Sequence, residues 1–483
     1  MKKLTFMFVL AMLSGMVSCG STGSGQPTDG TTSGGDGGDI STEPEKTGVV
    51  QKLTDAEKES LGLDGYEFNV MTRSVDSYWA VFDMSADAET GDTMNDAVYR
   101  RNMYLEDKCG FTIKTSYSAD SSCSEINTYI LSGDDAFDAY FPVARQAGSA
   151  ATDGLLYDLY TLPRLDLDND CWNSMFSDTL NYGGKLYYAT GAITTNGYDS
   201  IRLFMFNKTI AGKSNLADPY EMVRNGKWTI DAFNEMATGA AQDLNGDTQM
   251  TLDDQLGMAW QKYIGGVIFY YGSGEFVTTM DSENHPQVAV GGARSTEVYD
   301  KIRDMISDKK VYYQGEDADI LQAFYDGHSL FLTEVLDAAK RLRPYDVTFG
   351  ILPVPKYDEA QEEYIQYVDG WCLSPVVVPV NASNPERTGF IIEAIAEESK
   401  NYLSAPYYDT VLNGKVLRDD ESSEMLDIVL NNFVLDNCDL YQWSGMMDTV
   451  KDAMTNGKEL ASVIASSKSA LENAIKKTTE AIG

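Results

Sequence analysis

The sequence predicts an α/β fold with two lobes, each built on a mainly parallel sheet that is flanked by helices. Short apolar or alternating segments take turns with helical patterns along most of the 483 residues. This rhythm is typical of parallel strands joined by helical crossovers. The pattern starts again in the second half of the chain, and the roughly 435 residues after the N-terminal region suffice for two or three full cores.

The first half contains a strand–helix–strand–helix–strand series. Strands are predicted at 66–72, 111–117 and 137–143, where apolar residues are continuous or alternate with polar ones. Helices are predicted over 95–109, with apolar residues at helical spacing between charges, and around 124–132. Parallel strands ordered in this way bring their carboxyl ends to one edge of the sheet, where ligands commonly bind.

The second half repeats the style. Short apolar segments predict strands at 185–190, 202–207, 255–260, 349–355 and 371–379. Helical spacing predicts helices over 230–242, 385–403 and about 446–482. Thr229 is a suitable N-cap for the first of these helices, and Pro385 suits the first turn of the second.

The N-terminus predicts export. Lys2 and Lys3 precede a short apolar run, and small residues then lead to Cys19. The run is too short for a stable membrane span and resembles a lipoprotein signal peptide over 1–18, after which Cys19 carries the lipid. An ordinary secretory signal with an incidental cysteine is the alternative. Residues 19–48 are rich in Gly, Ser and Thr, and we expect them to form a flexible tether.

The charge restricts the partners. The chain has 37 basic against 74 acidic residues and a formal net charge of −37. A strongly negative surface opposes binding to nucleic acid and to anionic lipid surfaces. The ligand is therefore expected to be neutral or cationic.

The sequence offers no persuasive catalytic or thiol-based site. The only histidines, His285 and His328, lie far apart in the sequence and outside any catalytic pattern. With 74 acidic residues no carboxylate pair is singled out, so we expect a binding protein rather than an enzyme. The remaining cysteines form no metal spacing, and we expect most of them to be small core residues. These cysteines are Cys109, Cys123, Cys171, Cys372 and Cys438. A disulfide bridge between Cys109 and Cys123 is left open.

One stretch has the spacing of a calcium loop. "DLNGDTQMTLDD" at 243–254 places oxygen donors at positions one, three, five, seven, nine and twelve. These donors are Asp243, Asn245, Asp247, the carbonyl of Gln249, Thr251 and Asp254. Position six is Thr248 where glycine is usual, and position twelve is Asp where Glu is commoner, although loops of dockerin modules also carry Asp there. We expect a structural Ca²⁺, because no second helix follows to form a sensor hand; an acidic turn without metal is the alternative.

Six segments in order resemble the extracellular solute-binding proteins of bacterial carbohydrate ABC transporters, the family that includes maltose-binding proteins. Phe206-Asn207-Lys208, for example, stands where that family commonly has Tyr-Asn-Lys. The segments are 91–113, 137–159, 183–211, 218–237, 324–332 and 349–364. No single segment decides the matter, but their order over most of the chain does.

The resemblance implies a monomeric, two-lobe periplasmic-binding-protein fold of the Venus-flytrap kind, whose lobes close on a sugar or oligosaccharide. It implies delivery of that ligand to the permease subunits of an ABC importer, with the lipid holding the protein at the extracytoplasmic face of the membrane. The expected crossings lie near 190–205, 365–380 and 405–415. The first lobe then comprises 49–190 with 370–410, and the second comprises 191–369 with 411–483.

A sugar site combines stacking aromatic rings with fixed carboxylate, amide and Arg partners. Residues of these types that follow strands or occupy a crossing are the predicted ligand contacts, and Asp337 follows the same strand as Glu334. They are Trp79, Arg145, Asn196, Tyr198, Asp199, Trp260, Tyr263, Tyr270, Glu334, Asp369 and Trp371. Trp172, Trp228 and Trp443 are expected in the core or at a lobe edge.

The main hypothesis is a lipid-anchored solute-binding protein for carbohydrate import. The second hypothesis is a protein of the same fold that binds peptide or another solute, or that reports to a sensor. An exported glycan-active enzyme is the third, and turnover would separate it from the other two.

Overall fold

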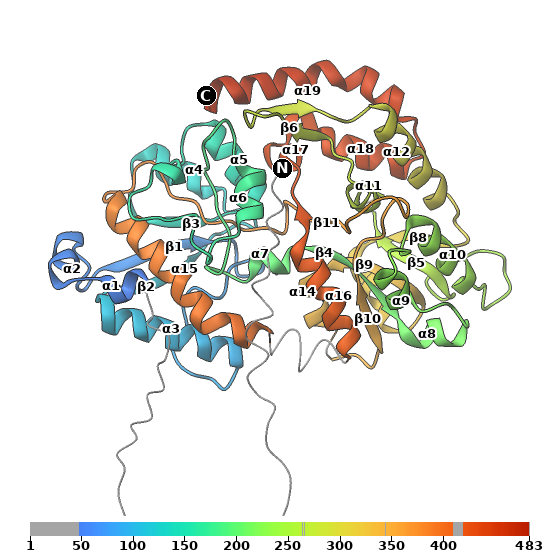
Figure 1. Ribbon diagram of the computed structural model, residues 1–483, viewed down its shortest axis with the longest axis horizontal. Coiled ribbons are helices and arrows are strands. Elements are labelled where there is room, and N and C mark those ends of the chain that lie inside the picture. The colour runs from blue at the N-terminus through green and yellow to red at the C-terminus, as the bar shows by residue number, and fades with distance from the viewer. Residues whose placement is uncertain (1–47, 263, 265, 343, 409–418, 483) are drawn as a thin grey trace, which may run out of the picture. The chain divides into compact units, whose positions relative to one another are not determined.

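The computed structural model describes residues 48–262, 264, 266–342, 344–408 and 419–482 (Figure 1). The described residues belong to one compact unit. The signal peptide, Cys19, Tyr263 and most of the third predicted crossing lie outside them. None of the helices in these ranges is both long and apolar enough to cross a membrane.

The first lobe is built on a parallel sheet with the strand order β2-β1-β3. Its strands are β1 (Glu67–Thr72), β2 (Thr112–Tyr117) and β3 (Ala139–Phe141). Its helices are α1 (Val49–Lys52), α2 (Asp55–Leu61), α3 (Thr93–Cys109), α4 (Glu125–Ser132), α5 (Ala144–Thr152), α6 (Ser174–Leu180) and α15 (Pro385–Tyr407). The five elements predicted in the first half are confirmed, and Pro385 begins α15 as expected.

The second lobe is built on a five-stranded sheet with the order β10-β4-β9-β5-β8. Its strands are β4 (Arg202–Asn207), β5 (Leu256–Gln261), β8 (Tyr312–Gly315), β9 (Ser329–Val335) and β10 (Phe349–Leu352). β5 runs parallel to β8 and β9, whereas β4 runs antiparallel to both of its neighbours. Thr229 caps α10 by accepting a hydrogen bond from the Ala232 amide, as predicted.

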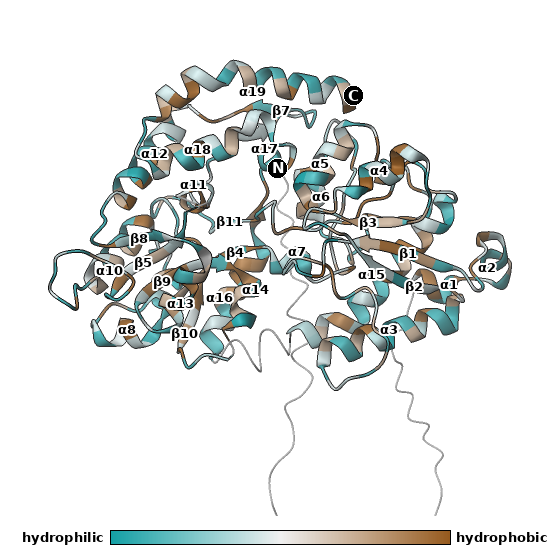
Figure 2. Ribbon diagram, turned by 180° about the vertical axis from the view of Figure 1, so that it is seen from behind, coloured by the Kyte–Doolittle hydropathy of each residue, from teal (hydrophilic) through white to brown (hydrophobic). Residues whose placement is uncertain are grey.

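Helices complete the second lobe, and two of them, α12 and α18, pack against each other. The helices are α8 (Lys208–Lys213), α9 (Pro219–Arg224), α10 (Ile230–Ala240), α11 (Val267–Gly272), α12 (Ala293–Ile306), α13 (Asp317–Tyr325), α14 (Leu336–Arg341), α16 (Asp420–Asn431) and α18 (Met446–Thr455). Two short pairs of strands accompany them, β6 (Thr278–Met280) with β7 (Pro286–Val288) and β11 (Gln366–Tyr367) with β12 (Phe433–Val434). Figure 2 shows the hydrophobic colours gathered on the strands, while surface helices such as α19 are mixed.

Two strand predictions are wrong. Residues 185–190 and 371–379 run without regular strand structure and make only isolated bridges, such as Ala189 with Val376. Pro375 and Pro379 lack the amide that a ladder requires, so the second segment cannot pair continuously. The single helix expected over 446–482 is two helices, α18 and α19 (Leu460–Ile482).

The chain passes between the two sheets beside α7 (Asn196–Asp199), which lies between them in Figure 1. Ile201 and Val368 form an antiparallel bridge there, so the outward and return segments lie side by side. The last part of the chain adds a further connection. The residues of α17 (Asn437–Tyr441) pack on α5, and the Tyr182 hydroxyl is 2.7 Å from the Thr479 hydroxyl of α19.

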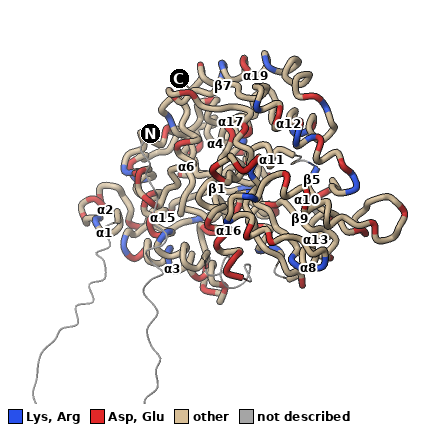
Figure 3. Tube along the Cα trace, turned by 45° about the vertical axis from the view of Figure 1, so that its right-hand side comes forward, with Lys and Arg blue, Asp and Glu red and all other residues tan. Residues whose placement is uncertain are grey.

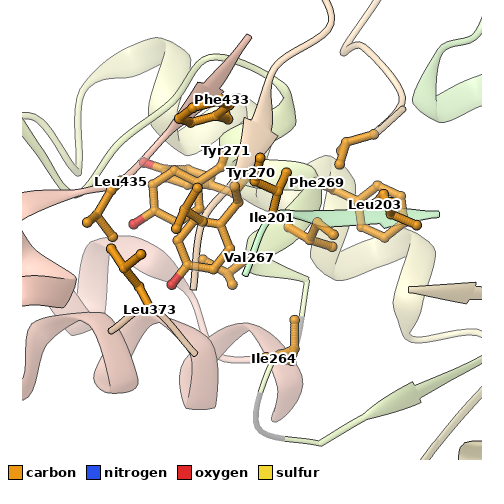
Figure 4. Close-up of a cluster of buried hydrophobic side chains, with 14 of the residues drawn as sticks. Ile201, Leu203, Ile264, Val267, Phe269, Tyr270, Tyr271, Leu373, Phe433 and Leu435 are labelled. Atoms are coloured by element: carbon orange, nitrogen blue, oxygen red, sulfur yellow. The ribbon is translucent and has the colours of Figure 1, made fainter. Parts of the chain in front are cut away.

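The core is rich in buried aromatic rings (Figure 4). Tyr270 and Tyr271 of α11 point into it, and the rings of Tyr271 and Tyr367 stack with centroids 4.6 Å apart. Trp172, Trp228 and Trp443 are buried, as expected. Within the described ranges all five cysteines are buried and free, so the bridge left open between Cys109 and Cys123 is not formed.

Helix α15 contains a buried carboxylate, Glu393, that fastens a neighbouring loop. It accepts hydrogen bonds from the Trp172 indole at 2.8 Å, the Asn169 amide at 2.9 Å and the Asp166 backbone at 3.2 Å. Burial and the charge of Glu397 raise the pKa of Glu393 from 4.5 to about 7, although the hydrogen bonds oppose this. The folded protein therefore holds a proton on Glu393 that the unfolded chain has lost between about pH 4.5 and 7.

Stability is expected to fall as the pH rises through this window, because the folded-state pKa of Glu393 is raised. Urea unfolding at pH 5 and pH 8 should show that Glu393 contributes on the order of 1–2 kcal/mol to this fall. A Glu393→Gln variant should show a smaller difference between the two pH values. Equal pH dependence in both proteins would show that Glu393 does not titrate in this range.

Candidate functional site

A cavity of about 440 Å³ lies at the carboxyl end of β1, where segments from both lobes meet. Its walls come from the loop after β1, the start of α3, residues 194–199 at the crossing, α14 of the second lobe and the end of α15. The lining residues are Tyr78, Trp79, Ala80, Val81, Phe82, Asp83, Ser85, Ala86, Asp92, Met94, Asn95, Val98, Thr194, Thr195, Asn196, Asp199, Asp337, Lys340 and Tyr407. The volume suits a small ligand of one or two sugar rings.

The loop after β1 is held in place by its own strand and by the return crossing. The Val81 amide donates to the Thr72 hydroxyl at 2.9 Å, which brings the loop back over the end of β1. The Trp79 carbonyl accepts from the Ser374 hydroxyl at 2.9 Å, and the Ser374 amide donates to the Asn196 side chain at 2.6 Å. Trp79 is thus anchored by its backbone while its half-buried ring lines the cavity.

A charged cluster spans the floor of the cavity. Asp199 of α7 accepts from Lys340 of α14 at 2.6 Å and from the Tyr407 hydroxyl at 2.8 Å. Asp337 lies 3.4 Å from the same ammonium group. Burial lowers the pKa of Lys340, but the charges of Asp199 and Asp337 outweigh it, so the pKa is raised and the lysine stays charged. Burial raises the pKa of Asp337.

A further carboxylate, Asp83, lines the cavity from the first lobe. Asp83 is nearly buried and accepts from the Thr194 hydroxyl at 2.9 Å and from the Thr195 amide at 2.7 Å. These bonds fix its orientation and leave lone pairs for a ligand. In total the lining has four aspartates and one lysine, together with the rings of Tyr78, Trp79, Phe82 and Tyr407. Aromatic faces beside fixed carboxylate and amide groups suit an uncharged, hydroxyl-rich ligand.

A separate buried ion network occupies the crossing. The Arg202 guanidinium donates to Asp369 at 2.8 Å and lies 3.9 Å from Glu334. Arg145 donates to Asp439 at 2.6 Å. Burial raises the pKa of Asp369, but the charges of Arg202, Lys451 and Arg145 outweigh it, so its pKa is lowered. These groups neutralise one another inside the protein.

The predicted ligand contacts separate into distinct sets. Trp79, Asn196 and Asp199 line the cavity, and Asp337 joins them. Arg145, Glu334 and Asp369 belong to the ion network. Trp260 and Tyr270 are buried, Tyr198 packs on Tyr407, and Tyr263 is outside the described residues. Trp371 is 42% exposed near Arg73 and does not line the cavity.

Most of the lining was not predicted, and the aromatic and charged side chains that were missed include Tyr78, Phe82, Asp83, Lys340 and Tyr407. The first three lie in the same loop as Trp79, so extending that prediction along the loop would have found them. Lys340 follows Asp337 by one helical turn and therefore faces the same way. Tyr407 ends a long helix, and nothing in the sequence marks that end as part of a site.

The acidic loop at 243–254 has the turns of a calcium loop but no gathered ligand set. Asp243 accepts from the amides of Gly246 at 2.7 Å and Thr248 at 2.8 Å, and Thr248 has the positive φ of 69° that position six requires. Asp254 accepts from the Leu244 and Thr251 amides with both oxygens. In the part of the chain that the structure describes, no three His, Cys, Asp or Glu side chains converge to hold a metal.

A family comparison decides the class of protein. A model described as bacterial extracellular solute-binding protein matches residues 101–406, more than half of the chain. The chain belongs to this family. Its members are extracellular binding proteins, so the predicted family is confirmed. A comparison of the sequence with curated proteins finds no match.

Solved structures confirm the two-lobe binding-protein fold of this solute-binding protein. A Listeria monocytogenes ABC substrate-binding protein in complex with cycloalternan has 15% identity and a TM-score of 0.54, over 87% of this chain and 100% of that one. The Bdellovibrio bacteriovorus maltose/maltodextrin-binding domain MalE, bound to maltotriose, has 13% identity and a TM-score of 0.52, over 86% and 99%. UgpB from Mycobacterium tuberculosis, in complex with glycerophosphocholine, has 14% identity and a TM-score of 0.57, over 86% and 99%.

Proposed function

We propose that this solute-binding protein captures a neutral sugar or oligosaccharide in the cavity beside Trp79 and delivers it to an ABC importer. The composition of the cavity is the observation that carries the proposal. An aromatic ring is held at the wall, fixed carboxylate and amide groups surround it, and both lobes contribute side chains. Closure of the lobes would surround the ligand, because Asp83 lies on one side and Lys340 on the other.

The charge of the lining favours uncharged ligands. Four aspartates against one lysine would repel a phosphate or carboxylate group brought into a cavity of this size. Figure 3 shows acidic and basic positions spread along the chain, and the formal net charge of −37 gives no long-range attraction for anions. Several solved relatives of the fold hold oligosaccharides, which supports the same class of ligand.

We propose that the residues lining the cavity bind the sugar. Trp79 stacks on a sugar ring, and the ligand hydroxyl groups bind to Asp83, Asn196, Asp199 and Asp337.

The lipid anchor is part of the same proposal. A lipid on Cys19 and a flexible segment over 19–48 would keep the binding domain near the permease while it collects solute.

A ligand panel tests the proposal. Thermal unfolding of the whole chain is measured with neutral mono- and oligosaccharides, uronic acids, glycerophosphocholine and short peptides. The midpoint is expected to rise with a neutral saccharide at saturating concentration and to stay constant with the anionic uronic acids and with the phosphodiester glycerophosphocholine. A rise with peptides alone would show that the protein is a peptide binder, and release of shortened glycan would show that it is an enzyme.

We further propose that Ca²⁺ binds the loop at 243–254 and clips the end of α10 to the start of β5. The donor types are hard oxygens, and the ion would have to draw Asp243, Asp247 and Asp254 together. Calcium added to chelator-treated protein is expected to raise the thermal midpoint. Asp243→Ala should remove the calcium-dependent part of the midpoint. An identical midpoint with calcium and with chelator would show that the loop is an acidic turn.

A further inference from the structure

Two exposed aromatic rings lie side by side at the mouth of the cavity. Phe82 is 50% exposed and Tyr117 is 41% exposed, and their ring centroids are 5.9 Å apart at an interplanar angle of 35°. Phe82 lines the cavity, whereas Tyr117 does not. We call this pair the outer aromatic pair. Its two rings connect the cavity with the surface beyond it.

The position of the outer aromatic pair is fixed by buried backbone. Tyr117 ends β2 and stands opposite Thr72 in the parallel ladder. Thr72 is buried, and its hydroxyl accepts from the Val81 amide at 2.9 Å, directly before Phe82. The Thr72 carbonyl accepts from the Ser118 amide at 2.9 Å, directly after Tyr117. One residue therefore holds both chain segments, and the pair is part of the framework of the first lobe.

The pair also has a polar component. Burial and the charge of Asp83, which lines the cavity, raise the pKa of Tyr117, so its hydroxyl keeps its proton. Among the described residues the Tyr117 hydroxyl has no hydrogen-bond partner, and it is free to bind a ligand hydroxyl group.

We infer that the outer aromatic pair is an additional sugar subsite, which binds the rings of an oligosaccharide that extend out of the cavity. The inference rests on the proposed function. Two observations support the inference. Phe82 belongs to both the cavity and the outer aromatic pair, and a cavity of about 440 Å³ holds about two sugar rings. A longer chain must leave the cavity, and the exposed face of Phe82 leads directly to Tyr117. Sugar rings stack on such faces, and the acidic surroundings suit neutral rather than anionic glycans.

Calorimetric titration of the whole chain tests the subsite with matched probes: maltose with maltotetraose, cellobiose with cellotetraose, and xylobiose with xylotetraose. In the series that binds, the tetrasaccharide is expected to bind about tenfold more tightly than the disaccharide, as one extra stacked ring would give. Tyr117→Ala should remove this advantage and leave disaccharide affinity unchanged. Tyr117→Phe should retain most of it. Tyr160→Ala, at an exposed tyrosine outside the cavity lining, is the matched control.

Each outcome has one meaning. Equal affinity for the two chain lengths, or an unchanged advantage in Tyr117→Ala with an unchanged thermal midpoint, overturns the subsite and leaves the proposed function standing. Binding of no member of the three series, in protein that also ignores the wider glycan panel, overturns both. If Tyr117→Ala instead alters the oligomeric state on size-exclusion chromatography, the pair is a contact between copies of the chain and the subsite is rejected.

Discussion

Asp369→Ala is expected to destabilise the protein by about 3–5 kcal/mol, the cost of leaving a buried cation without its partner. Arg202 and Asp369 are both buried, and the guanidinium donates to the same carboxylate oxygen at 3.1 and 2.8 Å. The lowered pKa of Asp369 gives the sign of the pH effect. The contribution of ionised Asp369 to the free energy of unfolding is fully present at a pH above the ordinary pKa of an aspartate. It is lost as the pH falls towards the lowered pKa of Asp369 in the folded protein.

Urea unfolding followed by circular dichroism measures this loss. Glu386→Ala is the matched control, because Glu386 pairs with Arg164 at 3.0 Å on the surface, where an ion pair contributes about 0–1 kcal/mol. Asp369→Asn should lose less than Asp369→Ala, since it retains the shape of the side chain. If the control and Asp369→Ala lose the same stability, the crossing network does not act as a buried ion pair.

Trp79→Ala is expected to weaken sugar binding by about tenfold to a hundredfold, the range for truncating a central tryptophan of a binding site. The ring lines the cavity, and its backbone is held by Ser374, so the loss should fall on the ligand rather than on the fold. Calorimetric titration with the saccharide found by the panel gives the affinity.

Trp371→Ala is the informative comparison for this result. Trp371 is also accessible, and it was predicted from its place at the return crossing, but the cavity lining does not include it. We expect this variant to bind as the wild type does. Loss of binding in Trp371→Ala together with full binding in Trp79→Ala would move the ligand site from the cavity to the crossing.

Most of the fold could be predicted because the elements of the first lobe have clear periodicity. The parallel order of β1, β2 and β3 follows from short strands joined by helices. The antiparallel insertion of β4 could not be predicted, since apolar strands look alike in either direction. The extended segment 371–379 misled the prediction because β-branched residues pattern like a strand while its prolines break the ladder.

The site was harder to predict than the fold. Asp369 and Glu334 have the residue type of sugar contacts, but the fold pairs them with Arg202, a partner more than 100 residues away in sequence from each. Trp260 was also predicted as a sugar contact, but it is buried in the core, where a tryptophan near the end of a strand packs equally well. Asp199 was predicted from its place at the first crossing, and the structure places it in the cavity lining. Lys340 was not predicted, although it lies one helical turn after Asp337 in α14.

A crystal structure of the protein saturated with the saccharide that raises its thermal midpoint would show directly whether the cavity beside Trp79 is the sugar site. We expect a sugar ring stacked on Trp79, with hydroxyl groups within hydrogen-bond distance of Asp83 or Asp199, between segments of both lobes. A saccharide bound anywhere else, or a cavity that stays free of sugar at saturation, would contradict it.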